Sequence, residues 1–136
     1  MDWSTLNPEV IAEFRANAGK VARFGDLAVI ILHTIGAKTG RTLEVPLLVV
    51  PRDDDILIYG TAAGAKSHPS WYYNLQAHPE IDVELGAERF GARIEQLADS
   101  EAEQLLTAHA EANTQLQQYL QDAAPRRVPV FRVDRI

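Results

Sequence analysis

The residues with the clearest chemical meaning lie at positions 34–41, a glycine-punctuated stretch that reads T-I-G-A-K-T-G-R. Gly36 and Gly40 permit a tight turn that brings backbone N–H groups close to a bound anion. Lys38 and Arg41 add positive charge at the same place, although the whole chain has a formal net charge of −6. A local cationic loop on an acidic chain indicates a site for an anionic ligand.

Two further stretches suit a flat ligand. Residues 60–65 read G-T-A-A-G-A, and such small side chains allow a ligand to approach the backbone closely. Residues 68–75 read H-P-S-W-Y-Y-N-L and predict the aromatic-rich start of a helix. This helix should end by His78, because a proline follows and disfavours helical geometry in the residue before it. The four-residue spacing of Trp71 and Leu75 also fits ordinary core packing.

Several familiar chemistries are excluded. The chain has no cysteine, which rules out disulfides, thiolate nucleophiles and zinc–thiolate sites. The glycine stretch lacks the Walker order of glycine and lysine, and no G-x-G-x-x-G motif occurs. Residues 38–40 mimic the K-T-G motif of β-lactamases, but no serine is followed by lysine three positions later. The four histidines are scattered and residues 53–55 fit a solvated hairpin turn, so we expect no metal.

Composition limits the class of protein. A length of 136 residues with 46% hydrophobic content fits a single domain, residues 1–136. An isoelectric point near 5.1 argues against general nucleic-acid binding, which uses a basic face. The longest apolar run, residues 27–32, is far below the roughly 20 residues that span a bilayer. We therefore expect a cytoplasmic protein with no integral membrane segment, and the sequence leaves its oligomeric state open.

The pattern along the chain predicts an α+β domain. Six short apolar or alternating runs predict strands at residues 27–32, 43–50, 56–59, 81–85, 90–94 and 128–133. Helices are expected from an Asn7 cap to Gly19, from Pro69 to His78, from a Ser100 capping box to Glu111, and around residues 116–120. Short sequential strands favour antiparallel pairing, and six of them can close into a barrel without free edges. The helix from Pro69 should pack at the mouth of that barrel.

The same residues resemble the deazaflavin-dependent nitroreductase family, the coenzyme F420-dependent quinone and nitro reductases of actinobacterial type. The loop of that family, T-T-G-x-K-S/T-G, is matched by residues 34–40. Its second signature, P-x-W-Y-x-N-L followed by A-x-P, is matched by residues 69–75 and 77–79. Residues 14–17 and 126–130 also look familial, although these terminal motifs are less specific.

The resemblance implies a six-stranded antiparallel split β-barrel of the flavin-binding type with flanking helices. It places the phosphodiester and glutamate tail of the deazaflavin on Lys38, Thr39, Gly40 and Arg41. The ring is expected along Tyr59, Gly60, Thr61 and Ala62, with Ser70, Trp71 and Asn74 closing the other side. Small residues beside the ring and N–H groups beside the anionic tail are physically suited to these roles.

The activity implied is hydride transfer from reduced coenzyme F420 to an electron-poor small molecule: a quinone, a nitroaromatic or an activated enone. The cofactor supplies the chemistry, and Thr61, Tyr119 or solvent could deliver the proton. Family members often carry arginine where this chain has Ala37 and Leu43, which leaves room for FMN in place of F420. The alternatives are therefore an FMN-dependent reductase or a non-catalytic flavin- or deazaflavin-binding carrier or sensor.

Overall fold

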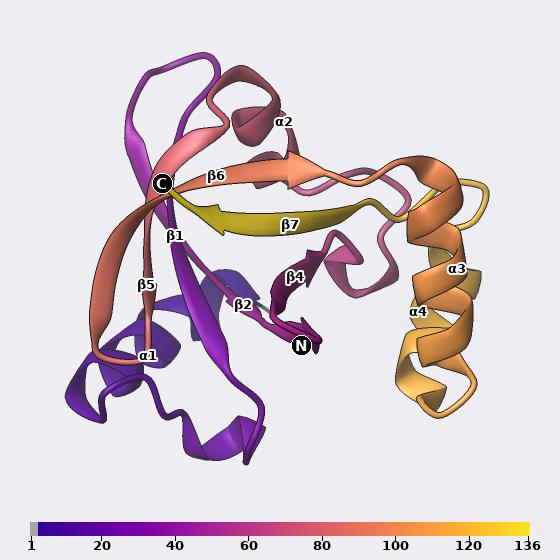
Figure 1. Ribbon diagram of the computed structural model, residues 1–136, viewed down its shortest axis with the longest axis horizontal. Coiled ribbons are helices and arrows are strands. Elements are labelled where there is room, and N and C mark those ends of the chain that lie inside the picture. The colour runs from indigo at the N-terminus through magenta and orange to yellow at the C-terminus, as the bar shows by residue number, and fades with distance from the viewer. Residues whose placement is uncertain (1–2) are drawn as a thin grey trace.

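A computed structural model describes residues 3–136, with side chains from residue 7 onward (Figure 1). Its helices are α1 (Trp3–Ala16), α2 (Ser70–Ala77), α3 (Asp99–Ala110) and α4 (Thr114–Ala123), with short 3-10 turns η1 (Ala22–Phe24) and η2 (Ala62–Gly64). Its strands are β1 (Val29–Ile35), β2 (Thr42–Leu48), β3 (Val50–Arg52), β4 (Asp55–Tyr59), β5 (Glu80–Leu85), β6 (Glu88–Gln96) and β7 (Val130–Arg135).

The strands form one curled antiparallel sheet in the order β2-β1-β5-β6-β7-β4-β3. Its two outermost strands, β2 and β3, follow each other in the chain and are separated only by Val49. The Val49 N–H donates to the carbonyl of Ala28 at 2.9 Å, in register with the β1–β2 pairing, and from Val50 onward the chain pairs with β4 instead, so the expected single strand is divided into two. The sheet therefore has seven strands where six were expected, and the chain itself joins its two ends. The expected α+β class and antiparallel barrel-type sheet are confirmed.

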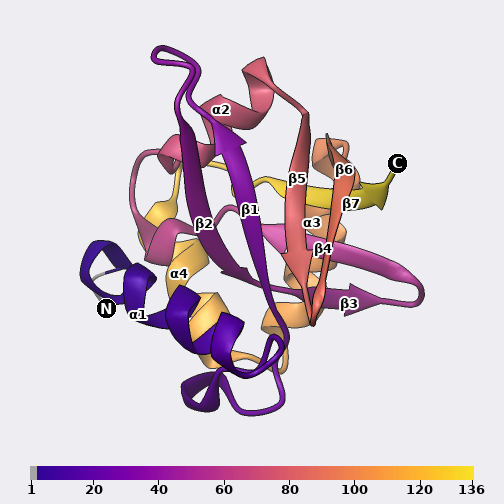
Figure 2. The ribbon, with the colours of Figure 1, turned by 90° about the vertical axis from the view of Figure 1, so that its left-hand side faces the viewer.

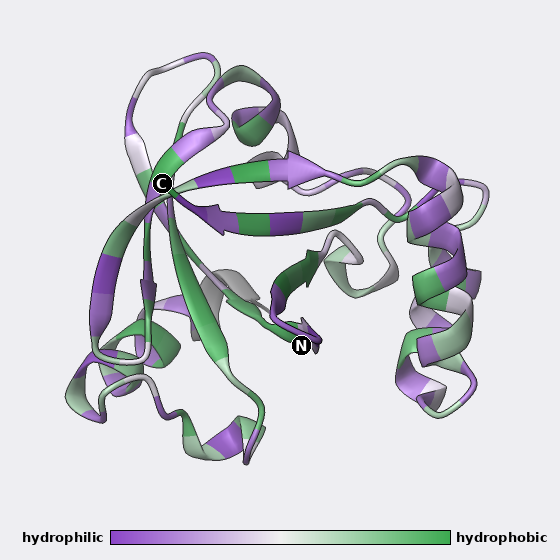
Figure 3. Ribbon diagram, in the orientation of Figure 1, coloured by the Kyte–Doolittle hydropathy of each residue, from purple (hydrophilic) through white to green (hydrophobic). Residues whose placement is uncertain are grey.

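Three groups of buried apolar side chains show what each helix covers. The barrel interior contains Ile30, Leu32, Val83 and Phe131 together with Trp71 and Leu75 of α2, so α2 packs at the mouth as expected. Helix α1 covers the outer side of β1 through Val10, Phe14, Val29 and Ile31. Helices α3 and α4 lie side by side in Figure 1 and cover β4 and β7 through Leu106, Leu116, Leu57 and Val130. The green segments of Figure 3 mark the apolar strand residues behind this arrangement.

Some expected element ends are wrong for local reasons. Helix α1 begins at Trp3, so Asn7 lies inside it and is not its cap, whereas Gly19 does end the turn by donating to Phe14 O at 2.8 Å. Strand β1 begins at Val29, two residues after the expected start at Leu27. Leu27 is 55% exposed and belongs to a turn, in which its N–H donates to the carbonyl of Phe24. Helix α3 is preceded by Ala98, and no side-chain hydrogen bond caps it at Ser100.

Three hairpins arrange the parts that matter for function. The β1–β2 hairpin carries residues 36–41 at its tip, near α2 in Figure 2, and Asn74 of that helix bonds to Ala37. The β3–β4 hairpin turns at residues 53–54, as expected for the aspartates, and β4 then leads directly into residues 60–65. The β5–β6 hairpin turns at Gly86, also as expected. No helix in the described part of the chain is long and apolar enough to cross a membrane.

Candidate functional site

Residues 36–41, called the glycine loop below, are held largely by their own backbone. The N–H of Gly36 donates to Arg41 O at 2.8 Å, and the N–H of Gly40 donates to Gly36 O at 2.9 Å. The Thr39 hydroxyl accepts the N–H of Arg41 at 3.2 Å. Gly40 has a φ of +71°, which a residue with a side chain adopts only at a cost. Lys38, Thr39, Gly40 and Arg41 are all exposed, so the structure brings these four predicted site residues together on the surface.

The two cations of the glycine loop differ from most other cations of the protein. Arg15, Arg23, Arg52, Arg89, Arg93, Arg127, Arg132 and Arg135 all pair with carboxylates. Among the residues that the structure describes, no carboxylate pairs with Lys38 or Arg41. In a chain of net charge −6, two adjacent cations without a protein counterion form a binding surface suited to an anion.

Helix α2 connects the glycine loop to the barrel interior. Asn74 is only 8% exposed, and its Oδ1 accepts the N–H of Ala37 at 2.9 Å. Trp71 is 7% exposed and meets Phe131 edge to face, with 5.5 Å between ring centroids. Ser70, the first residue of the helix, is exposed. Of the three predicted α2 site residues, Asn74 therefore positions the loop, Trp71 packs in the core, and Ser70 faces solvent.

Residues 60–65, called the small-residue segment below, have an unusual backbone. Ala62 and Ala63 have φ values of +49° and +53°, a left-handed conformation that costs a residue with a Cβ about 1–2 kcal/mol. A Cβ on Gly60 would lie 2.7 Å from the Pro129 side chain, and one on Gly64 would lie 3.3 Å from the backbone of Tyr119. The segment thus fits closely between Pro129, just before β7, and α4. Strained backbone of this kind concentrates at functional sites.

One side chain from the C-terminal third holds this segment. Arg126 donates to three of its carbonyl oxygens, those of Gly60 at 3.0 Å, Thr61 at 2.9 Å and Ala65 at 3.0 Å. Lys66 adds a second link by donating to Ala124 O at 2.6 Å. Sequence reasoning missed this role of Arg126, and its only signal was the weak familial motif at residues 126–130.

The predicted residues Tyr59 and Tyr119 both lie next to the small-residue segment. Tyr59 lies next to Gly60, but its hydroxyl is 3.0 Å from Nδ1 of His109 on α3, and its ring packs with the α3–α4 group. Burial raises the pKa of the Tyr59 hydroxyl, which keeps it protonated as a donor. Tyr119 lies on α4 against η2, and its described contact with Gly64 is made by its backbone.

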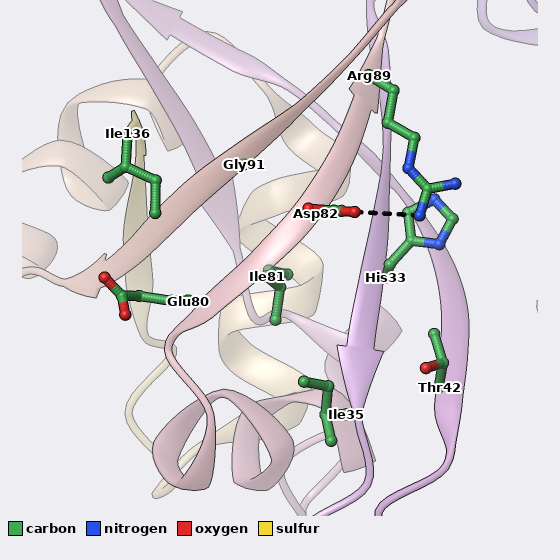
Figure 4. A pocket seen from close by; sticks show the side chains of 9 residues that line it. All are labelled: His33, Ile35, Thr42, Glu80, Ile81, Asp82, Arg89, Gly91 and Ile136. Atoms are coloured by element: carbon green, nitrogen blue, oxygen red, sulfur yellow. Dashed lines mark hydrogen bonds and ion pairs between the residues drawn. The ribbon is translucent and has the colours of Figure 1, made fainter.

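A shallow groove of about 370 Å³ lies on the outer side of β1, β5 and β6 (Figure 4). Its lining comprises His33, Ile35, Thr42, Glu80, Ile81, Asp82, Arg89, Gly91 and Ile136. None of the predicted cofactor residues belongs to it. Glu80 and Asp82 make it unsuited to an anionic ligand, because its one cation, Arg89, already pairs with Asp82 at 3.1 Å. We therefore place the candidate site by its chemistry, at the glycine loop and the small-residue segment.

A second charged cluster lies between α1 and the sheet. Arg15 bridges Glu44 and Glu84, and Nε2 of His33 lies 2.7 Å from the Glu84 carboxylate. Ligand atoms of His33, Glu44 and Glu84 lie within 4.8 Å of one another, a grouping that their distant sequence positions did not reveal. The hydrogen bond from Arg15 lowers the pKa of Glu84. The guanidinium already supplies the positive charge here, and the expectation of no metal stays a prediction.

Comparison with known proteins identifies the family of the chain. Residues 7–134 match the model of the family described as F420H(2)-dependent quinone reductase. An F420H(2)-dependent quinone reductase of Mycobacterium tuberculosis is 32% identical over 108 residues, which cover 78% of this chain and 72% of that protein. The solved structure of an F420-H2 dependent reductase is 29% identical, with a TM-score of 0.65 over 78% of this chain and 93% of that one.

A further solved structure, described as a domain-swapped dimer, has a TM-score of 0.68 at 24% identity and covers 96% of this chain and 98% of its own. At that identity it supports the fold alone. The family match extends over almost all of the described residues, including both halves of the candidate site. The chain therefore belongs to the F420H2-dependent quinone reductase family, oxidoreductases that use reduced coenzyme F420.

Proposed function

We propose that this chain reduces a quinone with a hydride from coenzyme F420 bound across the glycine loop and the small-residue segment. The observation that supports this most directly is the pair of cations without a protein counterion, Lys38 and Arg41, in an otherwise acidic and extensively ion-paired chain. An anionic tail provides the missing counterion. The second half of the site, the small-residue segment, has small side chains and a closely packed backbone, as a flat ring requires.

The residues would divide the work by their chemistry. Lys38 and Arg41 would hold the tail by charge-assisted hydrogen bonds, while Thr39 and Gly40 shape the turn. Asn74 would keep the loop in place through the Ala37 N–H. The ring would lie beside Tyr59, Gly60, Thr61 and Ala62, with the Ser70 end of α2 and the wall formed by Trp71 on the other side.

Bound reduced F420 supplies a hydride, which is two electrons and one proton, and the quinone becomes a hydroquinone when it takes up a second proton. The protein would orient the two molecules and limit water at the reacting atoms. Thr61, whose side chain bears a hydroxyl, is one candidate source of the proton, and Tyr119 or solvent is the other. The organisation as one cofactor-binding domain, residues 1–136, and the cytoplasmic location stay predictions.

The test is a matched titration of the purified protein with F420 and with FMN at one ionic strength, followed by stopped-flow mixing of the reduced complex with menadione. We expect tighter binding of F420 and cofactor oxidation that depends on both protein and quinone. Tighter binding of FMN would instead indicate an FMN-dependent reductase. Tight binding of F420 without oxidation by menadione, nitroaromatics or enones would indicate a carrier or sensor.

A further inference from the structure

The imidazole of His68 lies at the point where the small-residue segment meets α2. Its ring stacks on that of Tyr72, with centroids 3.9 Å apart and planes 11° from parallel, and it meets Tyr73 edge to face. Nδ1 of His68 lies 3.3 Å from Nη1 of Arg126. The same Nη1 donates to Gly60 O, so one guanidinium nitrogen joins His68 to the small-residue segment.

This contact determines which nitrogen of His68 carries the proton. A guanidinium has five N–H donors and no acceptor, so Nδ1 facing it must be the unprotonated nitrogen. The neutral ring then carries its proton on Nε2, at the opposite edge. Protonation of Nδ1 would place an N–H group and a positive charge against Arg126. Burial and the charge of Arg126 accordingly lower the pKa of His68.

The Nε2–H group is available for a ligand. Among the described residues, none is hydrogen-bonded to Nε2 of His68, whereas Nδ1 faces Arg126, one ring face stacks on Tyr72, and Arg126 holds the neighbouring carbonyls. His68 is only half-buried, so this donor can be reached from outside the protein. A stacked, fixed ring with one free donor is a preorganised hydrogen-bonding group, because little side-chain entropy remains to be lost on binding.

Arg126 also explains how two left-handed alanines persist beside this histidine. The carbonyls that it holds, at Gly60 and Thr61 on one side and Ala65 on the other, bracket Ala62 and Ala63. Strained residues persist only when their surroundings determine their geometry. Arg126 therefore fixes both the backbone beside the ring and the tautomer of His68.

We propose that His68 donates a hydrogen bond from Nε2–H to a carbonyl oxygen of the bound flat molecule, and that Arg126 is the positioning residue that holds it in this tautomer. The acceptor oxygen belongs either to the pyrimidine end of the deazaflavin or to the quinone. The inference rests on the proposed function for the place of the ring, but the state of His68 in the free protein does not.

The first experiment concerns the free protein and uses ¹⁵N-histidine NMR, with the His68 signal assigned by its loss in His68→Gln. We expect an unprotonated Nδ1 and a protonated Nε2 at neutral pH, with protonation of the ring only below the usual histidine range. Arg126→Met, which removes the charge, should raise the pKa of His68 and mix the tautomers. Arg127→Met is the matched control, because Arg127 is exposed and pairs with Asp99 on the surface. A protonated Nδ1 in the wild-type protein would overturn the proposal.

The second experiment uses three substitutions that separate the two nitrogens. His68→Gln keeps an amide donor near the position of Nε2, His68→Asn keeps one only near Nδ1, and His68→Phe keeps the stacking on Tyr72 alone. We expect Asn and Phe to lower the affinity or kcat/KM about tenfold and Gln to lower it about threefold or less. Thermal unfolding of all three variants identifies any loss that is only structural.

Two measurements identify the acceptor oxygen. A loss of F420 affinity without quinone assigns it to the deazaflavin, and a raised KM for menadione at saturating F420 assigns it to the quinone. Equal behaviour of the Gln, Asn and Phe variants would contradict the proposal. If the wild-type protein does not bind F420 at all, the proposed function fails, while the NMR result on His68 still stands or falls by itself.

Discussion

The two halves of the candidate site are built in opposite ways. The glycine loop is exposed and closed by hydrogen bonds within residues 36–41, with Asn74 as its one described link to the rest of the protein. The small-residue segment is held from outside, by Arg126 and by close contact with Pro129 and Tyr119. A charged ligand group can thus be bound by a local turn, whereas a flat ring needs a surface that exists only after the distant end of the chain has folded against it.

The largest expected effect breaks the small-residue segment. In Gly64→Val, the new Cβ would lie 2.8 Å from the Asp122 side chain at a backbone φ of +84°, so both overpacking and strain result. We expect a loss of about 3 kcal/mol in the free energy of unfolding, measured by urea denaturation. Gly86→Val is the control, because it also has a positive φ but its Cβ would meet nothing within 4 Å. Equal losses in both variants would show that close packing at Gly64 is unimportant.

The next effect removes the hydrogen bond that links the glycine loop to α2. Asn74→Ala should lower the free energy of unfolding by about 1–2 kcal/mol, because a buried amide loses its bond to the loop. It should also weaken F420 binding, since the loop becomes less ordered. Gln76→Ala, on the exposed side of the same helix, should change neither quantity. Denaturation and fluorescence titration measure the two effects, and unchanged binding in Asn74→Ala would show that the loop keeps its shape without α2.

A smaller effect tests the charge of the glycine loop. Lys38→Ala or Arg41→Ala should weaken F420 binding about tenfold, or about 1.4 kcal/mol, while hydride transfer at saturation stays near the wild-type rate. The loss should shrink at high salt, because screening already weakens the wild-type contact. Single-turnover kinetics with cofactor titrated at low and high salt separates binding from chemistry. Lys20→Ala, which removes one exposed charge elsewhere, should bind like the wild type.

The smallest expected effect is on the stability of the glycine loop, for comparison with that of the small-residue segment. Gly40→Ala meets no atom within 4 Å of the new Cβ, so only its φ of +71° opposes the change. We expect a loss of about 1 kcal/mol in stability, well below that of Gly64→Val, with the site still able to bind F420. Circular dichroism during thermal unfolding is sufficient to measure it. A loss as large as that of Gly64→Val would contradict the description of the loop as self-contained.

The self-contained half of the site could be predicted from the sequence, and the half held by distant residues could be predicted only in part. The glycine loop was predictable because its glycines, cations and hydroxyl lie within eight residues, and a turn depends on its own sequence. The end of α2 at His78 was equally local, since a proline follows it. The placement of Trp71 in the core was the ordinary interpretation of its spacing from Leu75.

What the sequence could not supply depends on residues that meet only in three dimensions. Arg126 lies 66 positions from Gly60, and Arg15 lies 69 positions from Glu84. No periodicity or motif relates such pairs, because sheet order decides which of them become neighbours. The division of the second expected strand at Val49 depends in the same way on distant partners, because β2 pairs with β1 whereas β3 pairs with β4.

The continuous strands on either side of Val49 fix how far apart the two halves of the site lie along the chain. From Arg41 to Gly60 the backbone passes through β2, Val49, β3, the turn at residues 53–54 and β4, so the span between the two halves of the site is set by a count of residues. Adding one residue at Val49 would exchange the inward and outward positions of β3 relative to β2. Homologues that bind longer or shorter ligands should therefore vary the length of loops outside this span and keep the count within it.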